Sequence, residues 1–108
     1  PQGWRGTVAD VTDEAAMAAL FDEIGVEWGG LDTLCANAGI AGPTARIEDI
    51  ALDDWRRCIE VNLDGAFLAA KFAARMMKPA GQGSVMLTSS TALTSTRQIC
   101  WYCPCRCW

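Results

Sequence analysis

The stretch that most constrains the fold is a short apolar run, Leu31–Ala36, which ends abruptly in Asn37-Ala38-Gly39. An apolar run of about four to eight residues, bounded by glycine turn signals, is typical of a buried parallel strand. Open α/β sheets bind their ligands at the carboxyl ends of such strands. The sequence therefore predicts a ligand-facing loop at residues 37–39.

Strand and helix patterns alternate on both sides of this run. The expected order is a strand at 5–11, a helix that begins at the N-cap Thr12 and ends at Gly29, a strand at 32–36, a long helix at 52–78 and a strand at 83–90. This alternation predicts an α/β fold, namely a partial doubly wound parallel sheet of the Rossmann-like type, with three strands and helices on its faces.

The long helix carries apolar residues at helical spacing, which predicts a buried stripe made of Trp55, Ile59, Leu63, Ala66, Phe67, Ala70, Ala73 and Met77. Asn62 lies on this stripe, so its amide is expected to face the interior and to need partners there. The segment 62–65 combines Asn and Gly, which have poor helix propensity. A kink or a join between two helices is therefore expected at this point.

Composition limits the function. The 108 residues suffice for one ordinary domain, and 51% hydrophobic with 20% charged residues is typical of a soluble globular protein. A formal net charge of −4 leaves no basic patch for nucleic acid. The most apolar stretch, 66–77, contains Lys71 and Arg75 and is shorter than the roughly 20 residues of a membrane span. We see no signal peptide at residues 1–4 and expect a cytoplasmic protein.

The cysteines fall into two groups. Cys35 and Cys58 sit inside apolar patterns, where buried free thiols are expected. Four more lie within the last nine residues, at Cys100, Cys103, Cys105 and Cys107. Their C-x-x-C and C-x-C spacings leave open an alternative function, the binding of Zn or Cu(I) by the tail. No histidine is present to assist, and we assign no metal site.

Four local features together resemble the short-chain dehydrogenase/reductase family. They are Asp10-Val11 after the first strand, Asn37-Ala38-Gly39 after the second, Asn62 within Val61-Asn62-Leu63-Asp64-Gly65, and Ser89-Ser90 after the third. Each motif occurs by chance elsewhere, and their order and spacing carry the resemblance. It covers about residues 5–92, which correspond to the middle of a family member.

The resemblance implies a nicotinamide dinucleotide, NAD or NADP, as cofactor. Asp10 and Val11 match residues that hold the adenine, and Asn37, Ala38 and Gly39 match the loop beside the adenosine and ribose. Small residues there let the backbone approach the cofactor closely. A simple turn before the helix and a turn that ends the strand are the structural alternatives for these two motifs.

The resemblance also implies catalytic residues for hydride transfer between the cofactor and a small carbonyl compound or secondary alcohol. Asn62 matches the residue that braces the long helix and holds a water in the proton relay. Ser90 matches the catalytic serine, which binds the substrate oxygen. Tyr102 falls near the position of the catalytic tyrosine, but Pro104 and Arg106 depart from the expected Tyr-x-x-x-Lys helix.

Two parts of the family pattern are missing from this sequence. The glycine-rich turn that cradles the pyrophosphate does not occur before Asp10, and no intact Tyr-x-x-x-Lys pair follows Ser90. We therefore divide the chain into a partial dinucleotide-binding domain, 1–92, and an atypical Cys/Trp-rich tail, 93–108. We expect the chain as written to be inactive, and a non-catalytic remnant remains an alternative.

The resemblance has two further implications for assembly. Family members commonly form homo-oligomers through the helix that matches residues 52–78. In the doubly wound strand order, the strand at 5–11 lies beyond two strands that this sequence lacks. We therefore expect that strand to be left without its family neighbours and the isolated chain to be marginally stable.

Overall fold

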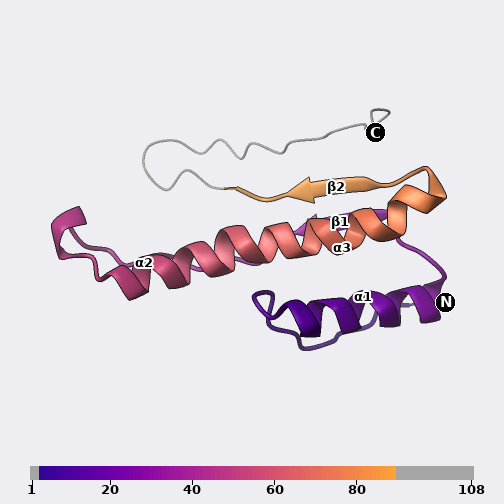
Figure 1. The fold of residues 1–108 in the computed structure, drawn as a ribbon, viewed down its shortest axis with the longest axis horizontal. Helices are drawn as coiled ribbons and strands as arrows, with labels where there is room; N and C mark the ends of the chain where they lie inside the picture. Colours follow the sequence, from indigo (N-terminus) through magenta and orange to yellow (C-terminus); the bar gives the residue numbers. More distant parts are fainter. Residues whose placement is uncertain (1–2, 90–108) are drawn as a thin grey trace.

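The computed structural model describes residues 3–89 of the chain. Its elements are α1 (Glu14–Trp28), β1 (Thr33–Ala36), a 3-10 turn (Ile47–Asp49), α2 (Leu52–Ile59), a π-helical segment (Glu60–Asp64), α3 (Gly65–Ala80) and β2 (Ser84–Leu87). Figure 1 shows that α2, the π-helical segment and α3 form one long rod. Ser90, Tyr102 and the cysteines of the tail lie outside the described residues.

Helix α1 begins one residue later than the sequence suggested. Asp13, not Thr12, is the N-cap, because its carboxylate accepts from the backbone N–H groups of Ala15 and Ala16. The Thr12 hydroxyl instead donates to Asp10. Gly29 ends the helix as predicted, with a positive φ of 75° that glycine adopts without strain.

The predicted weak point of the long helix is confirmed, and its form is a π-helical segment at Glu60–Asp64. Such segments widen one turn of a helix and are frequent at functional sites. Beyond it, α3 buries Ala73 and Met77 of the predicted stripe, together with residues outside that stripe. The buried residues of α3 are Gly65, Leu68, Ala69, Phe72, Ala73 and Met77. Trp55, Leu63 and Phe67 are 51%, 60% and 62% exposed, so their predicted burial was wrong.

The sheet contains two parallel strands within the described residues, not three. β1 pairs with β2 in a register that sets Thr33 opposite Ser84 and Ala36 opposite Leu87. The pairing extends at both ends, where Ser84 donates to the Asp32 carbonyl and Thr88 to the Ala36 carbonyl. Residues 5–10 have no regular secondary structure and belong to no sheet, so the predicted first strand was wrong. The strands that would flank it in the doubly wound order are not in this sequence.

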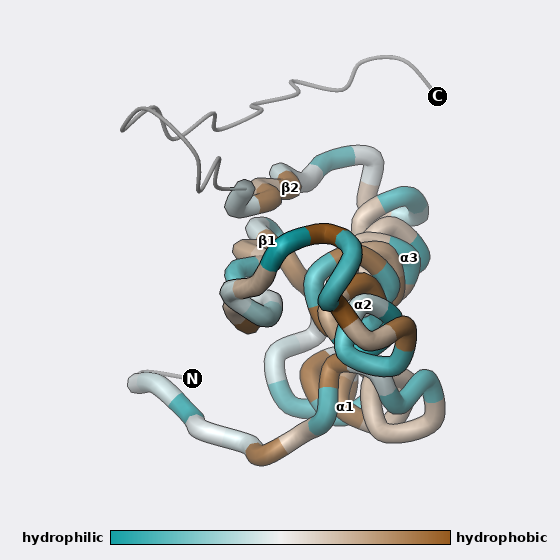
Figure 2. The backbone as a smooth tube through the Cα atoms, turned by 90° about the vertical axis from the view of Figure 1, so that its left-hand side faces the viewer, coloured by the Kyte–Doolittle hydropathy of each residue, from teal (hydrophilic) through white to brown (hydrophobic). Residues whose placement is uncertain are grey.

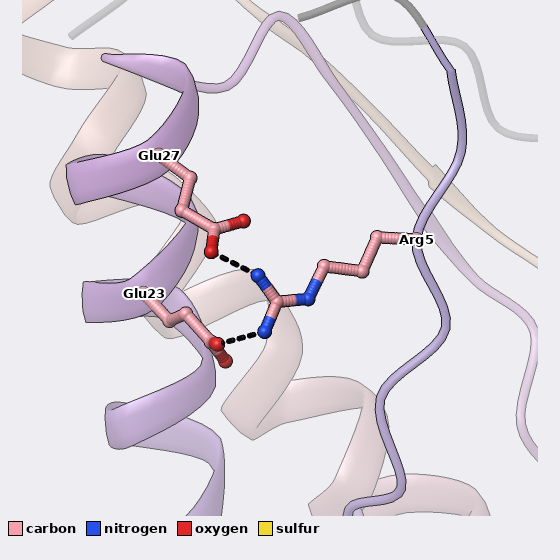
Figure 3. Close-up of polar contacts among 3 residues, drawn as sticks. All are labelled: Arg5, Glu23 and Glu27. Atoms are coloured by element: carbon pink, nitrogen blue, oxygen red, sulfur yellow. Dashed lines mark hydrogen bonds and ion pairs between the residues drawn. The ribbon is translucent and has the colours of Figure 1, made fainter.

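The N-terminal segment contacts α1 through ion pairs, and it has no backbone hydrogen bonds to a neighbouring strand among the described residues. Arg5 donates to both Glu23 and Glu27, which lie one turn apart on the helix (Figure 3). These carboxylates raise the pKa of Arg5 above its ordinary value. Because all three side chains are well exposed, solvent screens the contacts and they add little stability.

Helix α3 lies between α1 and the two strands (Figures 1 and 2). The core is therefore built around it, from Met17, Phe21, Leu68, Ala69, Phe72, Ala73 and Met77. Leu34 and Val85 pack on this core from the strands. The opposite face of the sheet is not covered by described residues. Cys35 is exposed for that reason and Cys58 is only half-buried, so their predicted burial was wrong.

Candidate functional site

The loop after β1 is fastened to the long helix by one side chain, that of Asn62. Its Oδ1 accepts from the Ile40 N–H at 2.8 Å, and its Nδ2 donates to the Ile40 carbonyl at 3.0 Å. The amide thus pairs with both backbone groups of one residue, as a neighbouring strand would. Asn37, Ala38 and Gly39, which lead into Ile40, are exposed. They form the loop at the carboxyl end of β1 that the sequence predicted.

Asn62 is exposed, so the prediction that it faces the interior was wrong. Trp55, seven residues earlier on the same predicted stripe, is also exposed, so this part of the stripe does not face the core. The expectation that its amide would need partners is confirmed by the two bonds to Ile40. A third bond runs from Nδ2 to the Cys58 Sγ at 3.3 Å.

Gly39 approaches this amide closely. A Cβ at position 39 would lie 3.2 Å from the Asn62 Oδ1, which is tighter than most real contacts of a Cβ. The glycine of the Asn-Ala-Gly motif therefore leaves room for the amide that fastens the loop. This role is additional to any contact with a ligand.

Asp10 has a fixed orientation in the turn before α1. Its Oδ1 accepts from the Thr12 backbone N–H at 2.9 Å and from the Thr12 hydroxyl at 2.8 Å. These hydrogen bonds hold the pKa of Asp10 below its ordinary value, with a smaller contribution from the charge of Arg57. The exposed carboxylate is therefore an ionised acceptor whose second oxygen accepts from none of the described residues.

Val11 packs directly against the start of α3. A Cβ at Gly65 would lie 2.8 Å from the Val11 Cγ2, so only glycine lets the two backbones come this close. Gly65 lies three residues after Asn62 in the same rod. The two predicted motifs, Asp10-Val11 and Asn37-Ala38-Gly39, are thus held against one turn of one helix.

The structure brings some of the predicted residues together and leaves others undescribed. Val11 and Gly39 lie against the π-helical segment and the start of α3, and Asp10, Asn37 and Ala38 directly precede them in the chain. β2 ends beside β1, since Leu87 pairs with Ala36. The chain that leads to Ser90 therefore leaves the sheet at the same edge as the loop. The positions of Ser90 and Tyr102 are outside the described residues.

The sequence analysis missed three contributors, which are the Ile40 backbone, Gly65 and Cys58. The Ile40 backbone leaves no signal in the sequence, because any residue supplies the same N–H and carbonyl. Gly65 was part of the quoted motif, and its role could have been found from its place three residues after Asn62, since residues three apart are neighbours on a helix. Cys58 could have been found four residues before Asn62, the spacing at which helical side chains meet.

Residues 3–89 also contain a cavity apart from this site, and they hold neither a metal-ligand cluster nor a membrane-spanning helix. No group of three or more potential metal ligands occurs in residues 3–89. None of the helices in this part of the chain has the length and hydropathy to cross a membrane. A cavity of about 230 Å³ lies between the N-terminal segment and α1, lined by residues that include Leu20, Ile24 and Trp28. None of the predicted site residues lines it.

Comparison with known proteins decides the family. A family model described as enoyl-(acyl carrier protein) reductase matches residues 3–107. The chain belongs to the short-chain dehydrogenase/reductase family. This confirms the resemblance seen in the motifs. Among curated short-chain dehydrogenase/reductase relatives, cis-4-hydroxycyclohexanecarboxylate dehydrogenase of Sinomonas cyclohexanicum is 48% identical over 81 residues, which are 75% of this chain and 32% of the relative. The chain thus spans about a third of the length of the curated relatives that it matches.

Solved structures agree with this assignment. An NAD⁺-bound xylitol dehydrogenase is 34% identical with a TM-score of 0.71, over 73% of this chain and 30% of the other. A structure of ElxO with NADP bound is 28% identical with a TM-score of 0.69, over 71% of this chain and 31% of the other. The predicted Rossmann-like α/β architecture of a short-chain dehydrogenase/reductase is therefore confirmed, apart from the third strand.

Proposed function

We propose that this chain serves an oxidoreductase that transfers hydride between NAD or NADP and a small carbonyl compound or secondary alcohol. The similar proteins support this, since one is named a dehydrogenase and two of the solved structures hold NAD⁺ or NADP. The observation that carries the proposal is the double hydrogen bond between Asn62 and Ile40. It fastens the loop at the carboxyl end of β1 to the same helix turn against which Val11 packs.

The described residues fit the adenosine half of such a cofactor. The free oxygen of Asp10 is oriented by Thr12 and can accept from the exocyclic amine of adenine. The Val11 N–H donates to no described residue and can donate to an adenine ring nitrogen. Gly39 has no side chain, so the loop backbone can come close to the ribose. Because the adenine and ribose are recognised by different motifs, both motifs must be held in fixed relation.

In this proposal the cofactor supplies the hydride, and the chain supplies orientation and proton transfer. Asn62 holds the loop and lies near the proton relay, while Ser90 orients the substrate oxygen and Tyr102 is the weakest candidate for the proton donor. The pyrophosphate cradle is not among these residues, and Arg106 stands where the family has Lys. We propose that the 108 residues bind the adenosine half without catalysing hydride transfer themselves.

The test is an NMR titration of the 108-residue chain with ADP-ribose and, separately, with NAD⁺. We expect the amide resonances of Val11 and of residues 37–40 to shift. Asp10→Ala should weaken binding by about tenfold, since a hydrogen bond to a charged group contributes about 1.5 kcal/mol or more. Asp22→Ala, on the exposed face of α1, is the matched control and should bind normally. Shifts confined to the cavity beside Trp28 would refute the assignment of the site.

We also propose that the protein is cytoplasmic and that it forms homo-oligomers through the rod of α2 and α3. The support is the exposure of Trp55, Leu63 and Phe67 along one rod, since large apolar side chains in water favour association. Sedimentation should show a dimer or larger species that Phe67→Glu dissociates. A monomer with the unchanged sequence, at concentrations where the chain is folded, would contradict the oligomer.

A further inference from the structure

Cys58 touches the candidate loop in two ways. Its Sγ accepts from the Asn62 Nδ2 at 3.3 Å, and the same sulfur would lie 3.4 Å from a Cβ built on Gly42. Asn62 in turn holds Ile40, two residues before Gly42. One half-buried thiol therefore bonds to the side chain that fastens the loop and lies over the face of Gly42 that carries no side chain.

The hydrogen-bond inventory of Asn62 shows what the thiol adds. A side-chain amide has two N–H donors and one carbonyl oxygen. The Ile40 N–H binds the oxygen and the Ile40 carbonyl takes one donor, so Cys58 takes the second. Turning the amide by half a rotation would set donor against donor and acceptor against acceptor at Ile40. Ile40 thus fixes which way the amide faces, and the Cys58 Sγ gives the Nδ2 group a second acceptor.

We propose that Cys58 is a positioning residue for the loop at residues 37–42, acting through Asn62. The inference rests on the proposed function, because it assigns Cys58 to the binding of the same adenosine-containing cofactor. Sulfur is a weak acceptor, so its contribution is that of a weak hydrogen bond plus packing. The thiol touches neither the cofactor nor the substrate in this assignment. Its effect is on how often the Asn62–Ile40 pair opens.

Three substitutions separate the acceptor from the packing. Cys58→Ala removes both, and Cys58→Val keeps bulk but has no acceptor. Cys58→Ser keeps an acceptor on a smaller side chain. If the hydrogen-bond acceptor at position 58 matters, the loop stays closed in Cys58→Ser and opens more often in Cys58→Ala and Cys58→Val. Cys35→Ala is the matched control, since Cys35 is also a described free thiol but is exposed on β1.

The experiment measures hydrogen exchange of the Ile40 N–H, with the Phe21 N–H as the reference for global unfolding. We expect Cys58→Ala and Cys58→Val to speed exchange at Ile40 by about threefold to tenfold, the range set by one weak hydrogen bond. Exchange at Phe21 should stay unchanged, and Cys58→Ser and Cys35→Ala should resemble the unchanged chain. Two results would overturn the proposal. One is equal exchange at Ile40 in all variants, and the other is faster exchange in Cys58→Ser with unchanged exchange in Cys58→Val.

A second readout separates this proposal from the proposed function. The affinity for ADP-ribose should fall by a similar factor in Cys58→Ala and Cys58→Val and recover in Cys58→Ser. If the unchanged chain does not bind ADP-ribose, the proposed function fails, while exchange at Ile40 still tests the positioning of the loop. If ADP-ribose binds with the same affinity to the unchanged chain and to all three Cys58 variants, the proposed function stands and the role of Cys58 is refuted.

Discussion

Asn62→Leu is expected to release the loop after β1. The loss in free energy of ADP-ribose binding should exceed the loss in free energy of unfolding. The substitution leaves the Ile40 N–H and carbonyl without their partners. Ile40 is 43% exposed, so water replaces part of what is lost. The cost in unfolding free energy should therefore be about 1 to 2 kcal/mol. Urea denaturation measures this cost, and the titration with ADP-ribose measures the loss of binding.

Asn62→Asp tests the same contact more sharply. A carboxylate can still accept from the Ile40 N–H, but its other oxygen then faces the Ile40 carbonyl, so two acceptors meet. This repulsion should raise the pKa of the introduced carboxyl, because protonation restores a donor. A raised folded-state pKa stabilises the variant below its unfolded pKa, and this stability is lost as pH rises through the folded pKa. The Asn62→Asp variant should therefore be about as stable as Asn62→Leu at neutral pH, and it should be the more stable of the two in acid.

Asn37→Leu is the control for stability. Asn37 is exposed, and its side chain makes no hydrogen bond to the described residues. The same chemical change should leave the unfolding free energy within about 0.5 kcal/mol of the original value. If Asn37→Leu and Asn62→Leu had the same effect, the bond to Ile40 would not be what holds the loop.

The order of elements could be predicted from the sequence because each signal is local. Gly29 and Gly81 end their helices with positive φ, and the run that ends at Ala36 forms a strand. The strand at 5–11 could not be tested locally, since a strand exists only when a neighbour pairs with it. Its residues form no regular element, and no described strand pairs with them.

The buried face of the long helix was mispredicted for a different reason. The prediction assumed 3.6 residues per turn from Trp55 to Met77. The π-helical segment at Glu60–Asp64 adds to one turn and so rotates everything after it relative to what precedes it. Just after it, Phe67 is exposed and Leu68 buried. Farther along α3, Ala73 and Met77 are buried as the pattern predicts, while Trp55 is exposed although it precedes the altered turn. The π-helical segment therefore accounts for only part of the difference.

Gly65→Ala is expected to destabilise the chain, although alanine is the better helix former. Gly65 has φ −60° and ψ −44°, so alanine fits the backbone and gains about 1 kcal/mol of helix propensity. The new methyl group, however, would meet the Val11 Cγ2 at 2.8 Å and its Cβ at 3.1 Å. Valine is stiff about χ1 and cannot rotate away freely. Overpacking of this kind costs about 1 to 3 kcal/mol, which leaves a net loss of about 1 kcal/mol.

Gly25→Ala makes the same change in α1 and should have the opposite sign. A methyl group there would lie 3.7 Å from the Met76 Cε, an ordinary contact with a flexible side chain. The propensity gain then remains, and the unfolding free energy should rise by up to about 1 kcal/mol. Urea denaturation of both variants measures whether each substitution lowers or raises the free energy of unfolding. Stabilisation by both would mean that Val11 moves aside at little cost, so Gly65 would not fix the distance between Asp10-Val11 and the helix that carries Asn62.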